Sequence, residues 1–494
     1  MNPRLSTTRV FLAALFLGLF AMAARNVTDP DVWWHLKTGQ YIAEHKSVPH
    51  TDPFSFTRAG EPWVAHEWLT EILLYELERT TGFGGLIMTF AAIISAAFFL
   101  LYLRCGRAPY VAGITTLCAA WATIPVWGVR PQVLSLLLTS LWLLILERSE
   151  RSPKLLWWTL PITLLWVNLH AGFALGLALS ALFLAGEWIE RALGYPSQNP
   201  SRLRTAALIL LLDLLIVPLN PNGLRMFSYP IEALRSPAMQ NYIAEWASPN
   251  FHRAEYWPVL LIVLATFATL SWSPLKLRPR DLLLLLVSLY AALCSIRLIP
   301  LFVLIAVPLI STRLGKWPRS NSRPQSALGA RAALNGAILL AMAVFAAVHV
   351  ALVIQIQPQA EMQHFPSRAV AFLQTHSPSA RIFNHYDWGG YLIWRLHPST
   401  PVFIDGRADL YGQELLDQFA NTYQLKGTWQ QPLRQWSIDT VLVPPDSALA
   451  TGLRSSPDWT VSYEDSQAII LTALPHAIRR DPATGNPTLA KPSL

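Results

Sequence analysis

The chain is poor in charged residues. Asp, Glu, Lys and Arg make up only 14% of its 494 residues, whereas 53% are hydrophobic. Because soluble globular domains carry about 25% charged residues, this composition excludes an ordinary soluble protein. The scarcity of charge and the long apolar runs indicate a polytopic membrane protein.

Cysteine is scarce as well. Cys105, Cys118 and Cys294 lie in or beside apolar segments, and they form neither a Cys-x-x-Cys pair nor a His/Cys ligand pattern. The sequence therefore predicts no disulfide framework and no zinc knuckle. The HEWLT sequence at residues 66–70 is not a zinc-protease motif, because residue 70 is threonine and not a second histidine.

The net charge of +8 does not indicate a nucleic-acid partner. Lys and Arg are spread over short connections between apolar runs and form no patch with interleaved aromatic residues. The positive-inside rule explains this distribution better, so we expect a lipid bilayer around the chain and no nucleic acid.

About eleven apolar runs are long enough to cross a bilayer. The first, near residues 10–25, resembles a signal peptide, and we favour an uncleaved anchor. Lys and Arg concentrate in alternate connections, which places the N-terminus in the cytoplasm and the following loop outside the cytoplasmic (inner) membrane. We expect a transmembrane domain over residues 1–356 with a large first outer loop at 26–82.

The chain changes character after residue 356. Short β-branched runs alternate with helical patterns, which predicts a small extracytoplasmic α/β domain over residues 357–478. Residues 479–494 are polar and rich in proline, and we expect a disordered tail there. The expected fold class is an α-helical polytopic membrane protein with a C-terminal α/β domain.

The first outer loop collects residues that could do chemistry. Asp29 and Asp31 directly follow the first apolar run, and Trp33, Trp34 and His35 come within one helical turn. An amphipathic surface helix with interfacial tryptophans is an alternative interpretation. It does not explain the acids beside the bilayer. Further acids and imidazoles lie later in the same loop: Asp52, His66, Glu67 and Glu71.

Other outer connections also carry polar residues. Arg297 precedes a span, where a guanidinium suits a phosphate held at the membrane interface, although it could also extend toward water. His170 could bind substrate or simply cap the end of a span. Other members of this outward set are Arg130, Gln132, Asn168, Asn220, Asn222 and Glu245.

The C-terminal domain contains one conspicuous motif. Asp405-Gly406-Arg407 follows a predicted strand, which is where open α/β sheets place binding residues. The alternative is an internal ion pair between Asp405 and Arg407. If the motif is functional, this domain would close as a lid over the first outer loop and exclude water.

These features resemble the GT-C superfamily of integral membrane glycosyltransferases. The run from Asp29 to Lys37, DPDVWWHLK, is similar to the first outer loop of the oligosaccharyltransferase catalytic subunit, of protein mannosyltransferases and of aminoarabinose transferases. The run YDWGGY at residues 386–391 is similar to a signature of the oligosaccharyltransferase C-terminal domain. A second Asp-x-Asp motif is missing from the later outer loops, so His66, Glu67 or Glu71 would have to complete a metal site.

The resemblance implies transfer of a sugar from a polyprenyl-phosphate-linked donor to a glycan, lipid or protein acceptor. Asp31, or else Asp29, would be the base, with His35 beside them as a further catalytic residue. Arg297, Arg130 or a divalent metal such as Mg or Mn, held by Asp31 and Glu67, would stabilise the leaving phosphate. The expected substrate-binding residues are Arg297, Arg130, Trp33, Trp34, His66, Glu67, His170, Asp405 and Arg407.

Two non-catalytic alternatives remain open, a transporter of lipid-linked intermediates and an assembly scaffold. A transporter of this kind is built from repeated halves, and no half-repeat is visible in the sequence. A scaffold would tolerate loss of the acids that follow the first span.

Overall fold

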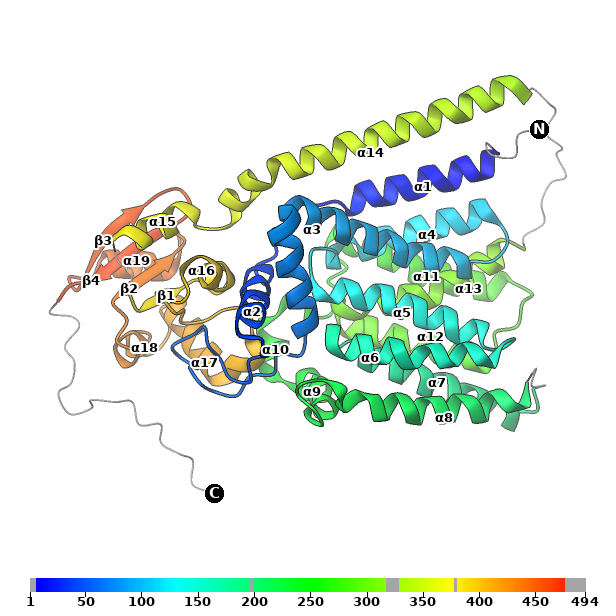
Figure 1. The fold of residues 1–494 in the computed structure, drawn as a ribbon, viewed down its shortest axis with the longest axis horizontal. Helices are drawn as coiled ribbons and strands as arrows, with labels where there is room; N and C mark the ends of the chain where they lie inside the picture. The colour runs from blue at the N-terminus through cyan, green and yellow to red at the C-terminus, as the bar shows by residue number, and fades with distance from the viewer. Residues whose placement is uncertain (1–5, 196–198, 317–327, 377–379, 476–494) are drawn as a thin grey trace. The chain divides into compact units, whose positions relative to one another are not determined.

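The computed structural model describes residues 6–195, 199–316, 328–376 and 380–475. The described residues form two compact units, one within 6–50 and 64–360 and one within 51–63 and 361–475 (Figure 1). The expected tail at 479–494 lies outside the described residues.

The first unit is a bundle of helices (Figure 1). Each expected apolar run falls mainly within one of its longer helices. Their bounds are α1 Thr7–Ala23, α2 Val32–His45, α3 Trp68–Arg104, α4 Pro109–Thr123, α5 Pro131–Arg148, α6 Thr159–Leu169, α7 Phe173–Ala192, α8 Pro200–Ile216, α9 Arg225–Arg235, α10 Pro237–Tyr242, α11 Trp257–Trp272, α12 Pro279–Cys294, α13 Ile299–Leu314 and α14 Leu328–His364.

The helices fit a multi-pass membrane protein. Within the described ranges, seven helical segments are long and apolar enough to cross a bilayer, and they correspond to α3, α4, α5, α7, α11, α13 and most of α14. The other four expected spans, α1, α6, α8 and α12, are helices of 11 to 17 residues. The count of eleven spans therefore stays a prediction.

Local sequence signals fix several helix boundaries. Proline occupies the first turn of α4, α5 and α12, where its missing N–H costs no hydrogen bond. Gly82 has φ +64° and kinks α3, a conformation that a residue with a side chain rarely adopts. The kink separates the first turns of α3, which carry Glu71, from the apolar remainder.

Close packing of α2 on α3 positions the polar residues of the first outer loop. A Cβ at Gly39 of α2 would lie 2.0 Å from the backbone oxygen of Glu71. Only glycine permits this approach, because any side chain would push α2 away from α3. The α2 face that meets α3 includes the fully buried Trp33 and the buried His35.

The second unit is a small α/β domain, as expected. Its sheet has the order β1-β2-β4-β3, with β1 parallel to β2 and the other neighbours antiparallel. The strands are β1 Ile382–Asn384, β2 Thr440–Val443, β3 Trp459–Glu464 and β4 Ile469–Ala473. The helices are α15 Ser367–His376, α16 Gly389–Leu396, α17 Ala408–Tyr423, α18 Gln430–Gln435 and α19 Ala448–Arg454.

Residues 51–63 of the first outer loop belong to this second unit. Ser55 bridges Val402, and Val402 bridges Ile382 of β1. The run 401–404, expected as a strand, makes only these isolated bridges, because its outer neighbour is a short irregular segment and not a strand. A domain assembled from two distant stretches was not anticipated from the sequence.

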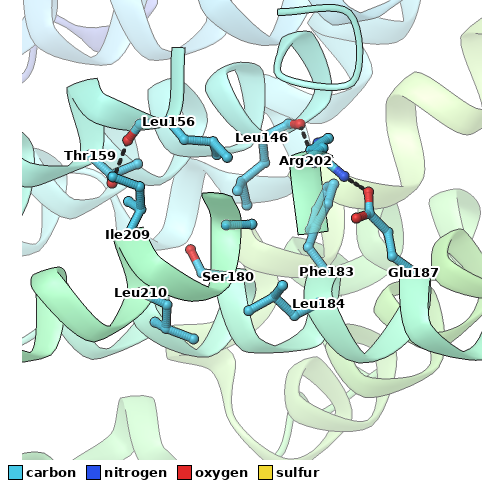
Figure 2. Close-up of a pocket in the computed structure, with 11 residues that line it drawn as sticks. Leu146, Leu156, Thr159, Ser180, Phe183, Leu184, Glu187, Arg202, Ile209 and Leu210 are labelled. Atoms are coloured by element: carbon cyan, nitrogen blue, oxygen red, sulfur yellow. Dashed lines mark hydrogen bonds and ion pairs between the residues drawn. The ribbon is translucent and has the colours of Figure 1, made fainter. Parts of the chain in front are cut away.

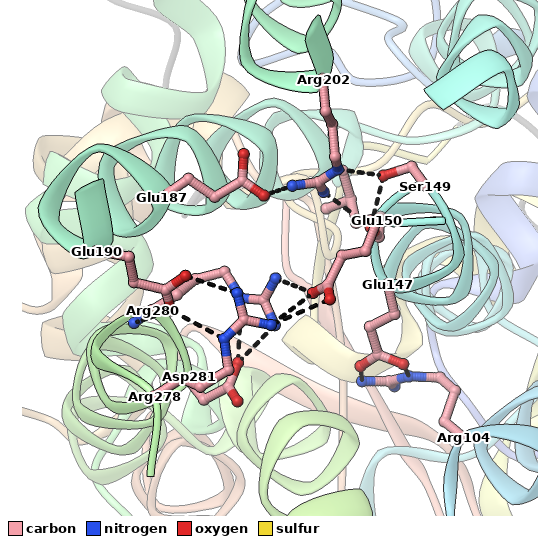
Figure 3. Close-up of polar contacts among 11 residues, drawn as sticks. Arg104, Glu147, Ser149, Glu150, Glu187, Glu190, Arg202, Arg278, Arg280 and Asp281 are labelled. Carbon is pink, nitrogen blue, oxygen red and sulfur yellow. Dashed lines mark hydrogen bonds and ion pairs between the residues drawn. The ribbon is translucent and has the colours of Figure 1, made fainter. Parts of the chain in front are cut away.

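One end of the first unit is held by a network of ion pairs (Figure 3). Arg104 at the end of α3 meets Glu147 near the end of α5 at 2.7 Å. Arg278 meets Glu190 at 2.6 Å and Glu150 at 3.0 Å. The remaining members are Arg202 with Glu187, and Arg280 with Glu150 and Asp281.

A small cavity of about 10 Å³ lies beside this network (Figure 2). Its lining is mainly apolar, from Leu146, Phe183 and Ile209, and Arg202 crosses one side to reach Glu187. A volume of this size holds at most about one water molecule. The ion-paired end is therefore tightly packed.

Candidate functional site

The acidic start of α2 is built by a local turn. The backbone N–H of Asp31 donates to the side chain of Asp29 at 2.9 Å, and Asp31 is the N-cap of α2. The indole Nε1–H of Trp34 donates to Asp31 Oδ1 at 3.0 Å. These contacts leave one oxygen of each carboxyl group for other partners.

Glu67, just before α3, gathers three imidazoles. Its Oε1 lies 3.2 Å from His66 Nε2 and 3.3 Å from His170 Nε2. Its Oε2 lies 3.4 Å from His35 Nε2. The structure therefore brings together four residues predicted from the sequence, although His170 lies about a hundred positions further along the chain.

The hydrogen bonds of His170 fix its tautomer. Its Nδ1 accepts from the backbone N–H of Gly172 at 2.9 Å and lies 2.7 Å from Ser135 Oγ. Ser135 Oγ also accepts from Trp166 Nε1 at 2.8 Å, so its own proton is directed to His170. A neutral His170 then carries its proton on Nε2 and donates it to Glu67.

His35 lies between two buried carboxyl groups. Its Nδ1 is 3.3 Å from Glu71 Oε1, and its Nε2 faces Glu67. Burial disfavours the imidazolium, but the hydrogen bond to Glu71 and the charge of Glu67 outweigh burial and raise the pKa of His35. Burial likewise disfavours the Glu67 carboxylate, yet His66 and His35 hold the pKa of Glu67 well below its usual range.

The same cluster could hold a metal. Among the described residues, His35, Glu67 and Glu71 form the one group of three or more His, Cys, Asp or Glu residues whose ligand atoms lie within 4.8 Å of one another. Asp31, predicted with Glu67 as a metal ligand, is not in this group. The Oε2 atom of Glu71 is buried and has no hydrogen-bond partner in the described part of the chain.

A second cluster joins Asp29 to the arginines. Arg130, the N-cap of α5, binds Asp29 at 2.7 Å and also binds Glu245. Glu245 in turn lies 3.3 Å from Arg297, whose guanidinium sits 5.4 Å from the ring centre of Trp246. A chain of direct contacts therefore links Asp31 and Asp29, through Arg130 and Glu245, to Arg297.

Electrostatics set the charge of this second cluster. Burial and then the charge of Asp29 raise the pKa of Asp31 to about 6, against the opposing charges of His35 and Arg130. Burial disfavours charge on Arg130, but Asp29 and Glu245 outweigh it and raise the pKa of the guanidinium. Arg130 and Arg297 similarly overcome burial and lower the pKa of Glu245.

The two tryptophans of the first outer loop are buried within the first unit. Trp33 has no exposed surface and packs on Phe83, with ring centres 5.4 Å apart. Trp34 is 8% exposed and stacks near His35, with ring centres 3.6 Å apart. Trp34 thus fixes the orientation of both Asp31 and His35.

Asp405 and Arg407 lie apart from these clusters, inside the second unit. Arg407 donates to Asp405 at 2.7 Å and to Asp52 at 2.8 Å, and it is only 2% exposed. Tyr411 also donates to Asp405. Arg407 therefore contacts a carboxylate of the first outer loop, but Asp52 belongs to the same unit as Arg407. The alternative of an internal ion pair describes this arrangement.

Two residues of these clusters, Glu245 and Ser135, were not predicted as site residues. Glu245 was noted among the outward polar residues, but its position between two arginines depends on tertiary structure. Ser135 lies in an apolar run, and a lone serine there is no signal of function.

Comparisons with known proteins support the fold. No protein-family model and no curated protein matches the sequence. Among solved structures, ArnT from Cupriavidus metallidurans, solved with undecaprenyl phosphate, aligns over 96% of this chain and 99% of its own, with TM-score 0.52 and 12% identity. The apo oligosaccharyltransferase of Archaeoglobus fulgidus aligns over 90% of this chain and 70% of its own, with TM-score 0.55 and 11% identity.

A third neighbour is larger. The arabinofuranosyltransferase AftD from Mycobacteria aligns over 95% of this chain, with TM-score 0.50 and 16% identity, and this chain covers 40% of its length. These neighbours are GT-C glycosyltransferases. The chain therefore has the GT-C fold, and the resemblance drawn from its sequence is confirmed at that level.

Proposed function

We propose that this protein is a membrane glycosyltransferase that moves a sugar from a polyprenyl-phosphate-linked donor to an acceptor. The observation that carries the proposal is the direct contact of Asp29 with Arg130 at 2.7 Å, on a GT-C fold. It links the acidic start of α2 to two arginines that share Glu245. The acidic start of α2 would supply the base, and Arg130 and Arg297 would bind the phosphate in the same site.

Asp31 is the proposed base. Its pKa of about 6 leaves it mostly ionised at neutral pH but still basic enough to accept a proton. The acceptor oxygen attacks the anomeric carbon as the bond from that carbon to the phosphate oxygen breaks. Asp31 takes the acceptor proton, and polyprenyl phosphate leaves with the bonding electrons. Asp29 positions Asp31 through the turn between them.

Arg130 and Arg297 are the proposed phosphate ligands. Both guanidiniums already bind a carboxylate, Glu245, which shows that an anion is stable between them. Once its bond to the sugar has broken, polyprenyl phosphate presents three terminal oxygens to the two arginines, whereas a carboxylate has two. The donor phosphate would therefore displace Glu245 and keep the same two arginines.

A divalent metal is the proposed cofactor, either Mg or Mn as expected from the sequence or another divalent cation. When bound, it would supply positive charge near the leaving phosphate. His35, Glu67 and Glu71 fit a metal because their ligand atoms converge and one oxygen of Glu71 is otherwise unpaired among the described residues. His66 and His170 orient Glu67.

The structural neighbours support this substrate class. ArnT was solved with undecaprenyl phosphate, and the archaeal enzyme AglB was solved with a dolichol-phosphate and an inhibitory peptide. We infer that this chain uses a similar lipid-linked donor and a glycan, lipid or protein acceptor. We place the site on the outer face of the inner membrane, following the distribution of Lys and Arg.

The test is the substitution Asp31→Asn in the full chain, with Asp446→Asn at an exposed position of the second unit as the matched control. Removal of the base should lower transfer by about 10²-fold or more. Both variants should elute as folded protein in detergent. Transfer from purified polyprenyl-phosphate sugars is the readout. Full activity of Asp31→Asn would reject Asp31 as the base, whereas absence of transfer by the wild-type protein would favour a scaffold or transporter.

A further inference from the structure

The short helix α9 has two faces of opposite exposure. On one face Met226 and Tyr229 are buried in the first unit, with 0% and 7% of their surface exposed. On another face four large apolar side chains are between 41% and 74% exposed: the N-cap Leu224 and, within the helix, Phe227, Ile231 and Leu234. Their spacing of three and four residues places them in one stripe along the helix. Because water disfavours such a stripe, it needs an apolar cover.

A tight turn fixes where α9 begins. The side chain of Asn220 donates to the carbonyl of Val167 in the last turn of α6 at 2.9 Å, and it accepts from the backbone N–H of Asn222 at 2.9 Å. Gly223 has φ +56°, a left-handed conformation that favours glycine. Figure 1 shows α9 at the end of α8, turned away from the axis of that helix. These outward asparagines therefore tie the start of α9 to the bundle.

The position of the stripe identifies its cover as lipid. The expected span α8 exposes a row of leucines, each between 49% and 73% exposed, at positions Leu208, Leu211 and Leu215, and Leu219 continues it. Only the turn at 220–223 separates this row from the stripe of α9, so the lipid that covers one reaches the other. The connection from α8 to α11 ends at Trp257, which is 55% exposed. A tryptophan at the end of a span is typical of the membrane interface.

Polar side chains line one edge of the stripe. The exposed polar residues of α9 are Arg225, Ser228, Glu232 and Arg235. Helical geometry places them between the apolar stripe and the buried face. A helix that lies in the plane of a bilayer surface has this arrangement, with its apolar side toward the acyl chains and its polar side toward water. A surface helix of a soluble domain would instead bury its apolar stripe.

We propose that α9 lies in the plane of the bilayer surface, with Phe227 and Ile231 inserted among the lipids, and that Tyr229 on its opposite face holds His66 in position. The ring centres of Tyr229 and His66 are 4.5 Å apart, and His66 Nε2 lies 3.2 Å from Glu67 Oε1. Tyr229 is a positioning residue, because it acts through His66. Its effect on transfer rests on the proposed function, whereas the docking of α9 on lipid does not.

Spin labels on the full-length chain measure the docking. The two exposed cysteines, Cys118 and Cys294, are first replaced by serine. Phe227→Cys, Ile231→Cys and, as the matched control on the polar edge, Glu232→Cys are then labelled and reconstituted in vesicles of phosphatidylcholine and phosphatidylglycerol. Power saturation compares collisions of each label with oxygen, which concentrates in lipid, and with a nickel complex, which stays in water.

We expect the labels at 227 and 231 to lie about 5–10 Å inside the headgroup boundary and the label at 232 to lie in water. Equal access of the nickel complex to all three labels would place the stripe in water and overturn the docking. Protection of the labels at 227 and 231 from both reagents would overturn it too, because protein would then cover the stripe.

Loss of docking should lower transfer without unfolding the protein. The double variant Phe227→Ser/Ile231→Ser should transfer about three- to tenfold more slowly in the same vesicles, because small displacements of an active-site group reduce the rate. Leu211→Ser, on the exposed face of α8, is the matched control for the loss of a lipid-facing side chain and should transfer as the wild type does. Equal rates in the double variant and the control would overturn the coupling of α9 to the site.

Tyr229 is tested by rescue. Tyr229→Ala should lower transfer by roughly tenfold while the label at 231 keeps its depth, and Tyr229→Phe should restore the rate because the ring on His66 remains. Equal losses in both variants would contradict the ring contact as the cause. Docked labels without transfer by the wild-type protein would reject the proposed function alone, and transfer with α9 in water would reject this inference alone.

Discussion

The two ends of the helical unit are both rich in ionised groups, but they differ in how those groups are matched. Arg130 precedes α5 and Glu147 lies in its last turn, so the 18 residues of this helix separate the two regions by about 27 Å. At the Glu147 end, five carboxylates meet four guanidiniums (Figure 3). At the Arg130 end, five carboxyl groups meet only two guanidiniums.

The difference separates a structural network from a candidate site. Every carboxylate of the ion-paired end has an arginine partner, and the adjacent cavity has room for at most about one water molecule (Figure 2). Buried polar atoms without a hydrogen-bond partner in the described chain lie at both ends, Arg313 Nε at the ion-paired end and Glu71 Oε2, Gln132 Oε1 and Trp246 Nε1 at the other. Unmatched buried groups and perturbed pKa values gather at functional sites because a ligand completes them.

The sharpest way to break this comparison is to remove one arginine from each end. Arg297→Gln should lower transfer at limiting donor by roughly 10–100-fold, because a hydrogen bond to a charged group contributes about 1.5–3 kcal/mol. Arg297 is partly exposed, so its loss should change the unfolding temperature little. Initial rates over a range of donor concentrations are the measurement.

The matched partner at the other end is Arg202→Gln. This substitution should lower the unfolding temperature, because Arg202 is buried and binds Glu187, Ser149 and the Leu146 carbonyl. Transfer per folded molecule should stay unchanged. Equal losses of transfer in both variants would contradict the division into a site and a structural network.

The pH dependence of transfer in the wild-type protein should report on the Arg130 end of the helical unit. Asp31 must be ionised to act as a base, and its raised pKa of about 6 means that it is protonated in acid and ionised above that pH. Transfer should therefore rise about tenfold between pH 5 and pH 7 and then level off. A rate profile with buffer controls tests this. A flat profile through this range would remove Asp31 from the role of base.

A substitution at the ion-paired end should change the stability of the fold and leave transfer unchanged. Glu150 binds both Arg278 and Arg280, and its neutralisation in Glu150→Gln leaves two guanidiniums undercompensated. We expect a loss of about 1–3 kcal/mol in the free energy of unfolding. Thermal unfolding in detergent measures it, with Glu255→Gln at an exposed pair as the control. A change in transfer kinetics would mean that the two ends are coupled.

The sequence predicted the fold better than the site. Apolar runs and alternating Lys and Arg anticipated the helices, because hydropathy reads directly along the chain. His35, Glu67 and His170 were predicted individually from their place in outer connections. The contacts of His35 and His170 with Glu67 depend on the kink at Gly82 and on the close approach of α2 to α3 at Gly39. No local sequence pattern shows either feature.

The second unit shows where sequence reasoning stops. Asp405 and Arg407 follow a predicted strand and were interpreted as binding residues, but Asp52 completes a buried ion pair with them. That partner lies more than three hundred residues earlier. A motif read without its tertiary partner cannot distinguish an internal ion pair from a ligand site.

The smallest expected effect on transfer concerns Glu245, which occupies the place between Arg130 and Arg297. If a donor phosphate displaces this carboxylate, removing its charge should help the phosphate to bind. Glu245→Gln keeps the size of the side chain and the backbone contact of Glu245 with Ser295 Oγ, 3.0 Å long. We expect affinity for polyprenyl phosphate to rise about three- to tenfold, or roughly 0.6–1.4 kcal/mol. Titration of detergent-solubilised protein with polyprenyl phosphate measures this change, and Glu255→Gln again serves as the control. Weaker binding in Glu245→Gln would show instead that Glu245 holds the arginines in place for the phosphate.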